Sequence, residues 1–456
     1  MSRDRGINVV GYLGGDAGVA EAARLLLASV RDAGIPHRCV TYDAADDIDS
    51  VSDAIYDVNL ICLNPPELRA FAFDAGPEFF EDRYTIGVWW WELSRLPRAY
   101  EAAFGLVDEI WVGSEFVADA IRRSTRKPVH VVPLPVRVPE PPPVSRADLS
   151  LPEGFLFLFM FDFLSVVERK NPSAVVDAFT RAFRPDDGAV LVLKTINGDV
   201  RPNDLADLRR AAEGRPDILV VDRRVSASER DAMIAACDCY VSLHRSEGFG
   251  LTIAEAMALG KPVVATAYSG SLTFMNDENS YGVRWAESSV PNGCDPYPEG
   301  AVWAEPDVAD AARGMRRVRD DGDYARTIGE RARDDIRRRH SPQTAAGFVA
   351  RRLDEIHAAG WPASASAAWR HVTAVRGAID VAVERLTVPE TSSRGTMIGP
   401  AVTATRRIAF RVLGRAYREA LVRAFREFVL AEQQLAKEID ALDARLRALE
   451  DDRRSP

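Results

Sequence analysis

The sequence has few cysteines and no long hydrophobic run. Its 456 residues include five cysteines, an odd number scattered along the chain without the paired spacing of a zinc site. The N-terminus lacks the apolar core of a secretory signal, and no later segment is long enough to span a bilayer. We therefore expect a protein of the reducing cytoplasm, with Cys237 and Cys239 in a buried strand; a redox pair is the alternative.

The chain also lacks an excess of positive charge, because 68 acidic residues outnumber 58 basic ones. The formal net charge is -10, which argues against a nucleic-acid partner. With 47% hydrophobic and 28% charged residues, a chain of this length is expected to form two globular domains and an extension.

Short apolar segments alternate with amphipathic ones over most of the chain, which is the β-α-β pattern of a parallel sheet. Seven prolines between positions 133 and 152 interrupt the alternation. We predict an α/β fold with two Rossmann-like domains, 1–140 and 141–358, whose strand ends face a cleft. Strands are expected at 7–13, 58–63, 84–89 and 109–113 and then at 155–161, 189–193, 218–221 and 240–243, and helices at 19–33, near 172, 204 and 228, and within 308–339 and 344–357.

The C-terminal residues differ in kind. Residues 359–400 have the small and turn-forming residues of a linker, and 401–456 form a predicted helical extension. Seven arginines within 405–427 predict either a solvated helix or a basic amphipathic helix on the inner face of a membrane. Residues 421–449 predict a coiled coil and a homo-oligomer. Its seam is Leu421, Phe425, Phe428, Glu432, Leu435, Ile439, Leu442, Leu446 and Leu449, apolar except at Glu432.

Two glutamates stand eight positions apart in the segment 244–270. On one continuous helix, Glu247 and Glu255 would point roughly 80° apart and could not easily share a ligand. Gly248 and Gly250 break the helix at its start, which leaves Glu247 in a loop and Glu255 on the helix that follows. The N–H groups at such a helix start bind a diphosphate, and a carboxylate farther along accepts hydrogen bonds from ribose hydroxyls.

A solvated glutamate and a glycine turn would explain these residues singly; together, after an apolar strand, they favour a nucleotide site. The run 241–262 resembles the signature of family 4 glycosyltransferases, in which seven residues separate two glutamates. The resemblance implies the GT-B fold and retaining transfer of a hexosyl unit from a nucleoside diphosphate sugar to a hydroxyl. It implies that Glu255 holds the donor ribose and Glu247 lies by the donor sugar. It also implies donor contacts from His244, Ser246, Gly248, Phe249, Gly250 and Leu251.

Arg169 and Lys170 form a second candidate element, a pair of cations at the point where a predicted strand ends and a helix begins. Two adjacent cations there neutralise a leaving diphosphate, although such a pair is commonly a solvated surface feature. The pair resembles the diphosphate-binding arginine and lysine of the family. A further arginine that many members have about five residues upstream is absent, because Leu164 and Ser165 occupy that region.

The first domain supplies weaker signals. Gly14 and Gly15 lie between the first strand and helix, where backbone can approach a ligand, and are assigned to the donor site. Trp90 and Trp91 are predicted to bind the acceptor, because aromatic faces stack on hexoses; core packing would account for at least one tryptophan of this run. Glu92, at a strand end, is predicted to orient an acceptor hydroxyl.

The Trp-Trp-Glu-Leu-Ser pattern resembles a subset that builds bacterial surface polysaccharides, which implies a saccharide or polysaccharide acceptor. A histidine found here in many members is absent. No essential metal or other cofactor is predicted, because the Asp-x-Asp triplets at 47–49 and 321–323 do not follow an apolar strand. The alternatives are a GT-B epimerase or phosphorylase, or a non-catalytic coiled-coil scaffold that binds nucleotide sugars.

Overall fold

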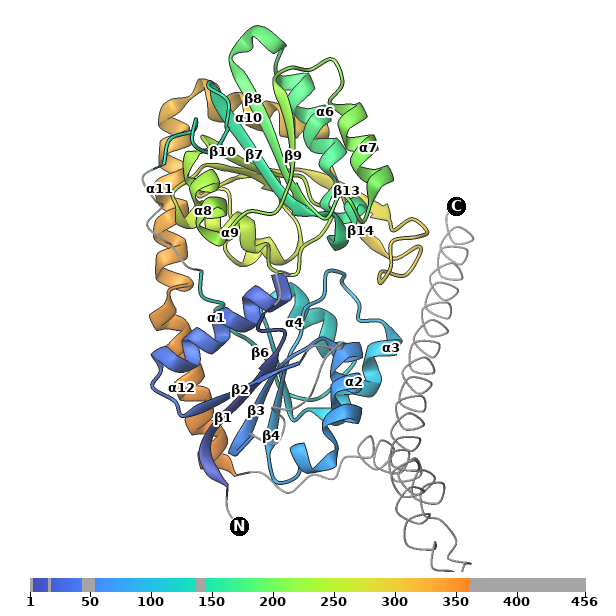
Figure 1. The fold of residues 1–456 in the computed structure, drawn as a ribbon, viewed down its shortest axis with the longest axis vertical. Coiled ribbons are helices and arrows are strands. Elements are labelled where there is room, and N and C mark those ends of the chain that lie inside the picture. The colour runs from blue at the N-terminus through green and yellow to red at the C-terminus, as the bar shows by residue number, and fades with distance from the viewer. Residues whose placement is uncertain (1–2, 15–17, 43–53, 137–143, 361–456) are drawn as a thin grey trace, which may run out of the picture.

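The computed structural model describes residues 3–14, 18–42, 54–136 and 144–360 (Figure 1). The first domain is built on a six-stranded sheet of order β2-β1-β3-β4-β5-β6, in which all neighbours pair in parallel. Its strands are β1 (Asp4–Gly11), β2 (His37–Thr41), β3 (Tyr56–Cys62), β4 (Tyr84–Val88), β5 (Glu109–Val112) and β6 (Val129–Val131). Its helices are α1 (Gly18–Asp32), α2 (Pro65–Ala75), α3 (Arg98–Glu101) and α4 (Glu115–Arg122).

The second domain repeats this design with a parallel sheet of order β12-β11-β10-β7-β8-β9. The strands are β7 (Phe155–Asp162), β8 (Ala189–Ile196), β9 (Ile218–Asp222), β10 (Cys239–Ser242), β11 (Val263–Thr266) and β12 (Tyr281–Val283), and β13 (Trp285–Ser289) and β14 (Val302–Pro306) form an antiparallel hairpin. The helices are α5 (Val167–Lys170), α6 (Pro172–Ala182), α7 (Pro202–Ala211), α8 (Ala227–Ala236), α9 (Leu251–Ala258), α10 (Val308–Asp320) and α11 (Gly322–Arg339).

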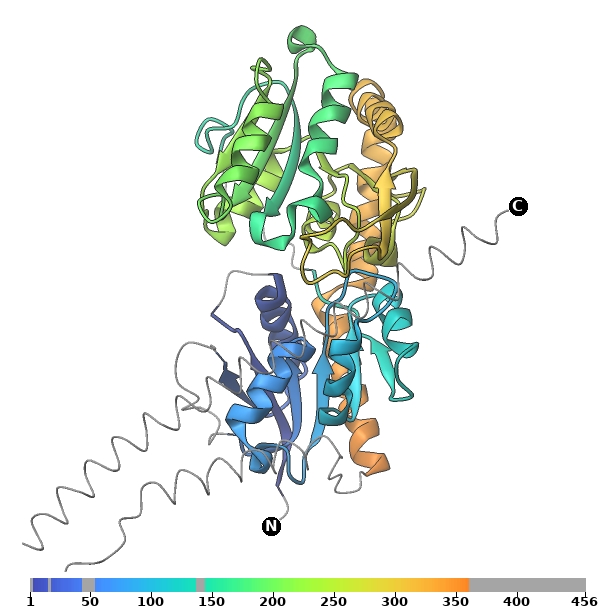
Figure 2. The same cartoon turned by 90° about the vertical axis from the view of Figure 1, so that its right-hand side faces the viewer.

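A last helix, α12 (Pro342–Ala359), returns to the first domain and packs against α1. Figures 1 and 2 show α11 beside the second domain and α12 beside the first, so the two helices run along both domains. Arg352 of α12 forms an ion pair of 2.5 Å with Glu109 of β5, whose side chain is fully buried. His357 lies 3.0 Å from Asp57. The end of the described chain is therefore tied to the first sheet by charged groups.

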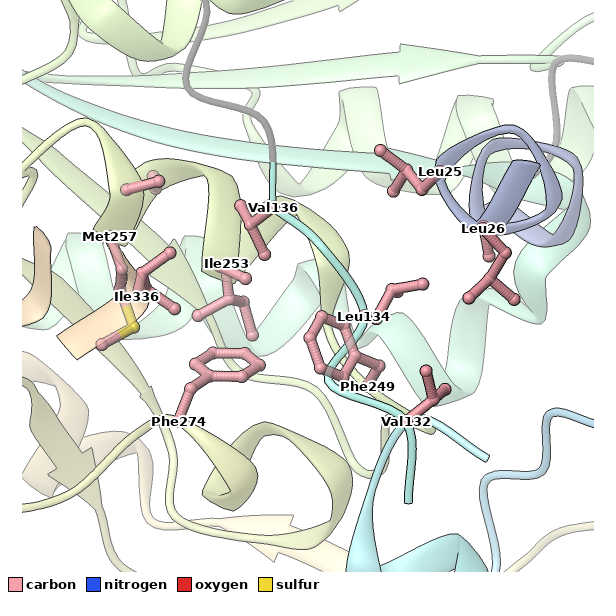
Figure 3. Packing of buried hydrophobic residues seen from close by; sticks show 14 of the residues in the cluster. Leu25, Leu26, Val132, Leu134, Val136, Phe249, Ile253, Met257, Phe274 and Ile336 are labelled. Carbon is pink, nitrogen blue, oxygen red and sulfur yellow. The ribbon is translucent and has the colours of Figure 1, made fainter. Parts of the chain in front are cut away.

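One apolar cluster runs through the contact between the domains. Figure 3 shows Leu25 and Leu26 of α1 and Phe249, Ile253 and Met257 of the second domain arranged around the chain that leaves β6. The residues of that connecting chain, Val132, Leu134 and Val136, are almost fully buried. Because the connection is part of the core, apolar burial favours a fixed position of one domain on the other.

The two parallel-sheet domains confirm the predicted architecture. The expected strands are present, and the predicted helical region 308–339 consists of two helices with Asp321 between them, whose side chain accepts from the backbone N–H of Tyr324. Cys239 lies in β10 as expected, whereas Cys237 lies outside the strand, directly after the end of α8; all five cysteines are free. In the described residues, none of the helices combines the length and apolar character required to cross a membrane. The linker 361–400, the basic helix and the coiled coil lie outside the described residues.

Candidate active site

Two loops of the second domain meet at the point where the order of the strands in its sheet reverses. β7 and β10 are neighbours, and the chain continues from β7 to one side and from β10 to the other. In open parallel sheets, ligands bind beyond the carboxyl ends of strands at such a switch point. Arg169 and Lys170 follow β7 on the short helix α5, and Glu247 follows β10 in a loop. The topology thus brings together residues that the sequence separates.

Arg169, Lys170 and Glu247 form a buried ionic cluster. Lys170 Nζ lies 2.5 Å from Glu247 Oε1, and Arg169 Nη1 lies 3.0 Å from Oε2. Burial would raise the pKa of Glu247, but the charges of Lys170 and Arg169 outweigh it and lower that pKa to about 2. Burial lowers the pKa of Lys170. Two cations facing one carboxylate leave net positive charge at the switch point, which suits a polyphosphate.

The backbone around Glu247 is fixed by the loop after β11. The Glu247 N–H donates to Ser269 Oγ at 2.8 Å, and the Gly270 N–H donates to the Glu247 carbonyl at 2.8 Å. A Cβ on residue 270 would lie 2.1 Å from the carbonyl oxygen of Gly248, so only glycine permits this approach. Arg169 Nη1 also donates to the carbonyl of Ser246 at 2.9 Å. The carboxylate therefore has little freedom to move.

Strained backbone borders the same cluster. Val166, Asn171 and Ser269 have φ values of 60°, 54° and 66°, in the left-handed region that non-glycine residues seldom occupy. Each such residue costs on the order of 1–3 kcal/mol and persists only where the surroundings hold it. The side-chain amide nitrogen of Asn171 and Arg169 Nε are also buried without a hydrogen-bond partner among the described residues. Such unpaired donors indicate a place where a ligand binds.

Glu255 lies on α9, behind the loop that holds Glu247. Its Oε1 is 3.3 Å from Arg230 Nη2 of α8, while Oε2 is buried without a partner among the described residues. Burial raises the pKa of Glu255 to about 7; Arg230 opposes this rise, and Asp231 and Glu21 add to it. Glu21 belongs to α1 of the first domain, so the Glu255 carboxyl of the second domain lies near the first.

The start of α9 has no side-chain cap. Gly250 precedes this helix with φ of 90° and ψ of 53°. The first N–H groups of a helix lack partners inside it and carry partial positive charge. With Arg169 and Lys170 on the neighbouring loop, this helix end provides the donors that a diphosphate requires.

Several residues assigned to the donor by resemblance also contribute to the contact between the two domains. Ser246 Oγ donates to the Glu92 carbonyl, and Ser114 Oγ donates to the Gly248 carbonyl at 2.7 Å. The Phe249 ring is buried 5.1 Å from the ring of Phe274. The side chains of Ser246 and Phe249 thus take part in domain contact, and Leu251 packs partly buried against the same core.

His244 is fully buried at the end of β10. One ring nitrogen lies 3.2 Å from Ser242 Oγ and the other 3.3 Å from the Tyr268 carbonyl. Burial lowers the pKa of His244 to about 4, so the ring is neutral at physiological pH. The imidazole supports the Glu247 loop and does not add positive charge to it.

The aromatic residues after β4 pack inside the protein. Trp90 and Trp91 are 8% and 1% exposed, and Trp91 Nε1 donates to the Arg95 carbonyl at 2.7 Å. Trp91 contacts Tyr100 and Tyr297 edge-on or tilted, with ring centroids 5.2 and 5.4 Å away. In contrast to the expected sugar platform, both tryptophan faces are covered by protein, because the second domain packs on this segment.

Glu92 is half-buried at the cleft edge, and its Oε2 accepts from the Tyr297 hydroxyl at 2.9 Å. Gly14 follows β1 with open space beside it, and Gly15 lies outside the described residues. Sequence reasoning missed Tyr297 and also Glu67, whose Oε2 is buried without a partner within the described residues. No local pattern marks either residue; only the fold brings Tyr297 to Glu92.

A metal site does not emerge from the described residues. Within these ranges, there is no group of three or more histidine, cysteine, aspartate or glutamate side chains that could hold an ion. Asp321 accepts from the Tyr324 N–H at the start of α11, and the Asp323 side chain is 86% exposed. Asp47 to Asp49 lie outside the described part. That the reaction needs no metal stays a prediction.

Comparisons with known proteins agree with this geometry. Residues 158–335 match the family model described as Glycosyl transferases group 1. A D-inositol 3-phosphate glycosyltransferase of Arthrobacter sp. (strain FB24) is 37% identical over 143 residues, or 30% of this chain and 33% of that protein. The chain therefore spans about a third of the length of the curated relative it matches. The family match therefore falls within the second domain.

Solved structures show the fold of the whole described region. Anabaena HepE in complex with UDP and glucose gives a TM-score of 0.58 at 14% identity, covering 77% of this chain and 100% of that one. Sucrose-phosphate synthase from Thermosynechococcus elongatus gives 0.59 at 16% identity, covering 78% and 100%. A glycosyltransferase from Rickettsia africae gives 0.57 at 12%, covering 78% and 99%. These similarities show the GT-B fold.

Proposed function

We propose that this protein is a retaining glycosyltransferase that moves a hexosyl unit from a nucleoside diphosphate sugar to a hydroxyl of a saccharide or polysaccharide. The observation that carries the proposal is the cluster of Arg169, Lys170 and Glu247 beside the uncapped start of α9, with Glu255 farther along that helix. Cations, helix N–H groups and a buried carboxyl match the diphosphate and the ribose of one nucleotide.

The donor would lie along α9. Its diphosphate would contact the first N–H groups of the helix, Arg169 and Lys170, and its ribose hydroxyls would donate to the unpartnered Oε2 of Glu255. Glu247 would then lie beside the sugar. Because it is held by both cations, its carboxylate would keep its charge near the anomeric carbon.

The chemical step exchanges one C–O bond for another. The bond between the anomeric carbon and the diphosphate oxygen breaks, the acceptor hydroxyl oxygen forms a new bond to the same carbon, and the proton of that hydroxyl passes to the departing diphosphate. Arg169 and Lys170 would stabilise the negative charge on the departing diphosphate, and Glu92 would accept a hydrogen bond from the acceptor hydroxyl. Positioning and electrostatics would supply most of the rate acceleration.

The C-terminal extension adds further proposals. We infer a homo-oligomer through the heptads at 421–449 and a cytoplasmic location, with contact between 405–427 and an anionic membrane as one role for the arginines. These segments lie outside the described residues. A saccharide acceptor, the absence of a metal cofactor and the surface-polysaccharide role likewise rest on the sequence.

Turnover tests the proposal. Purified full-length protein is incubated with UDP, GDP and ADP sugars, and with D-inositol 3-phosphate, glucose and N-acetylglucosamine as acceptor probes. We expect release of nucleoside diphosphate and a glycoside whose anomeric configuration, measured by NMR, equals that of the donor. A changed sugar without nucleotide release would indicate an epimerase, and turnover requiring inorganic phosphate would indicate a phosphorylase. Binding without any turnover would indicate a scaffold and contradict the proposal.

A further inference from the structure

The loop between β13 and β14 extends from the second domain onto the first. Its residues Val290, Cys294 and Tyr297 are buried in an apolar cluster that otherwise belongs mainly to the first domain and includes Trp91. The loop is closed on itself, because the Val290 N–H donates to the Ala301 carbonyl at 2.7 Å and the Tyr297 N–H to the Cys294 carbonyl at 2.9 Å. It therefore presents a defined surface to the first domain.

Tyr297 is the residue of this loop that reaches the cleft. Its ring packs between Trp91 and Trp303, at centroid distances of 5.4 and 6.3 Å. Its hydroxyl donates to Glu92 Oε2 at 2.9 Å, across the boundary between the domains. Burial raises the pKa of Tyr297 well above its ordinary value, so the hydroxyl keeps its proton and remains a donor.

This hydrogen bond leaves half of the Glu92 carboxylate available. Within the described ranges, the bond from Tyr297 is the only side-chain hydrogen bond of Glu92, and it uses Oε2. The Glu92 carbonyl also accepts from Ser246 Oγ, in the loop that carries Glu247. The second domain thus fixes both the backbone and one carboxylate oxygen of Glu92, while the other oxygen is left for a ligand.

We propose that Tyr297 is a positioning residue that orients the Glu92 carboxylate toward the acceptor hydroxyl when the β13–β14 loop rests on the first domain. This inference rests on the proposed function. It predicts that the hydroxyl of Tyr297 affects transfer to the acceptor much more than binding of the nucleotide, because that hydroxyl donates to Glu92 whereas Arg169 and Lys170 are held by Glu247.

A double-mutant cycle in the full-length chain tests this role. The variants are Tyr297→Phe, Glu92→Gln and both together, with Tyr100→Phe as the matched control, since Tyr100 also packs on Trp91. The probes are UDP-glucose with the three acceptors named above, and UDP alone for calorimetric binding. Thermal unfolding verifies that each variant is folded.

We expect Tyr297→Phe to lower kcat for transfer on the order of 10-fold to 100-fold, the range caused by a small misplacement of a reacting group. Glu92→Gln should lower it further, and the double variant should equal Glu92→Gln, because both changes remove one function. UDP affinity should stay within about twofold of the wild type, and Tyr100→Phe should behave as the wild type.

The two failures are distinguishable. If the wild type transfers glucose but Tyr297→Phe matches Tyr100→Phe, or if its effect multiplies with that of Glu92→Gln, the role of Tyr297 is wrong and the proposed function stands. A Tyr297→Phe variant that loses UDP affinity would also overturn the role. If the wild type transfers from no sugar nucleotide, the proposed function fails and this inference fails with it.

Discussion

The buried carboxylate of Glu255 should destabilise the folded protein at pH 8. Burial raises the pKa of its carboxyl from 4.5 to about 7, against the opposing charge of Arg230. A pKa higher in the folded than in the unfolded chain means that folding favours the protonated form. The stability that this proton provides is complete below pH 4.5 and is lost as the pH rises through 7. At pH 8 the chain therefore carries the full cost of a buried carboxylate.

The structure gives the size of this cost. The difference between 4.5 and about 7, at 1.36 kcal/mol for each pKa unit, corresponds to about 3 kcal/mol. The attraction of Arg230, 3.3 Å away, is already included in this net shift of the pKa, so it is not subtracted again. We therefore expect Glu255→Gln to be about 3 kcal/mol more stable than the wild type at pH 8 and within about 1 kcal/mol of it at pH 5.

Calorimetric unfolding of both proteins between pH 5 and 8 measures this difference. Glu229→Gln is the control, because the hydrogen bond from Arg223 lowers the pKa of Glu229 and its removal should have the opposite sign at pH 8. In the same samples Glu255→Gln should bind nucleotide less tightly, since ribose hydroxyls need an acceptor. If the stability of Glu255→Gln minus that of the wild type is smaller at pH 8 than at pH 5, the reasoning is refuted.

Two further substitutions test the supports of the site. Gly270→Ala places a Cβ 2.1 Å from the Gly248 carbonyl oxygen, so it should shift the Glu247 loop. We expect nucleotide binding, measured by calorimetric titration, to weaken at least about tenfold. The control Gly347→Ala, with open space around its Cβ, should bind nucleotide like the wild type. Unaltered binding by Gly270→Ala would contradict the assigned rigidity. Arg352→Ala leaves Glu109 buried without its cation and should cost about 3–5 kcal/mol in chemical unfolding. A loss below about 1 kcal/mol would show that Tyr84 and Trp111 satisfy that carboxylate alone.

Local sequence is enough to predict how the centre of the proposed donor site is built. Gly248 and Gly250 end the possibility of a continuous helix, so these two glycines by themselves place Glu247 in a loop and Glu255 on the helix that follows, α9. The alternation of apolar and amphipathic segments likewise predicts both parallel sheets, because central strands such as β3, β4, β7 and β10 are buried on both faces. Signals of this kind lie within short stretches of chain.

Contacts between distant segments could not be predicted. Trp90 and Trp91 suggested a sugar platform, yet the second domain covers them, with Tyr297 packed on Trp91. Tyr297 and Glu92 are 205 positions apart, and nothing in either neighbourhood indicates their hydrogen bond. The return of α12 to the first domain depends on Arg352 and Glu109, which are equally remote in sequence. Tertiary packing determines such contacts, and a local sequence motif contains no information about that packing.

The central claim is that Arg169, Lys170 and the start of α9 bind the diphosphate of a nucleotide. Calorimetric titration of UDP, GDP and ADP into the wild type, Lys170→Ala and the control Lys261→Ala tests it most directly. We predict that at least one nucleotide binds the wild type and Lys261→Ala alike and binds Lys170→Ala at least about tenfold more weakly, a loss of about 1.4 kcal/mol. Failure of all three nucleotides to bind the wild type, or equal affinity for Lys170→Ala, would contradict the account.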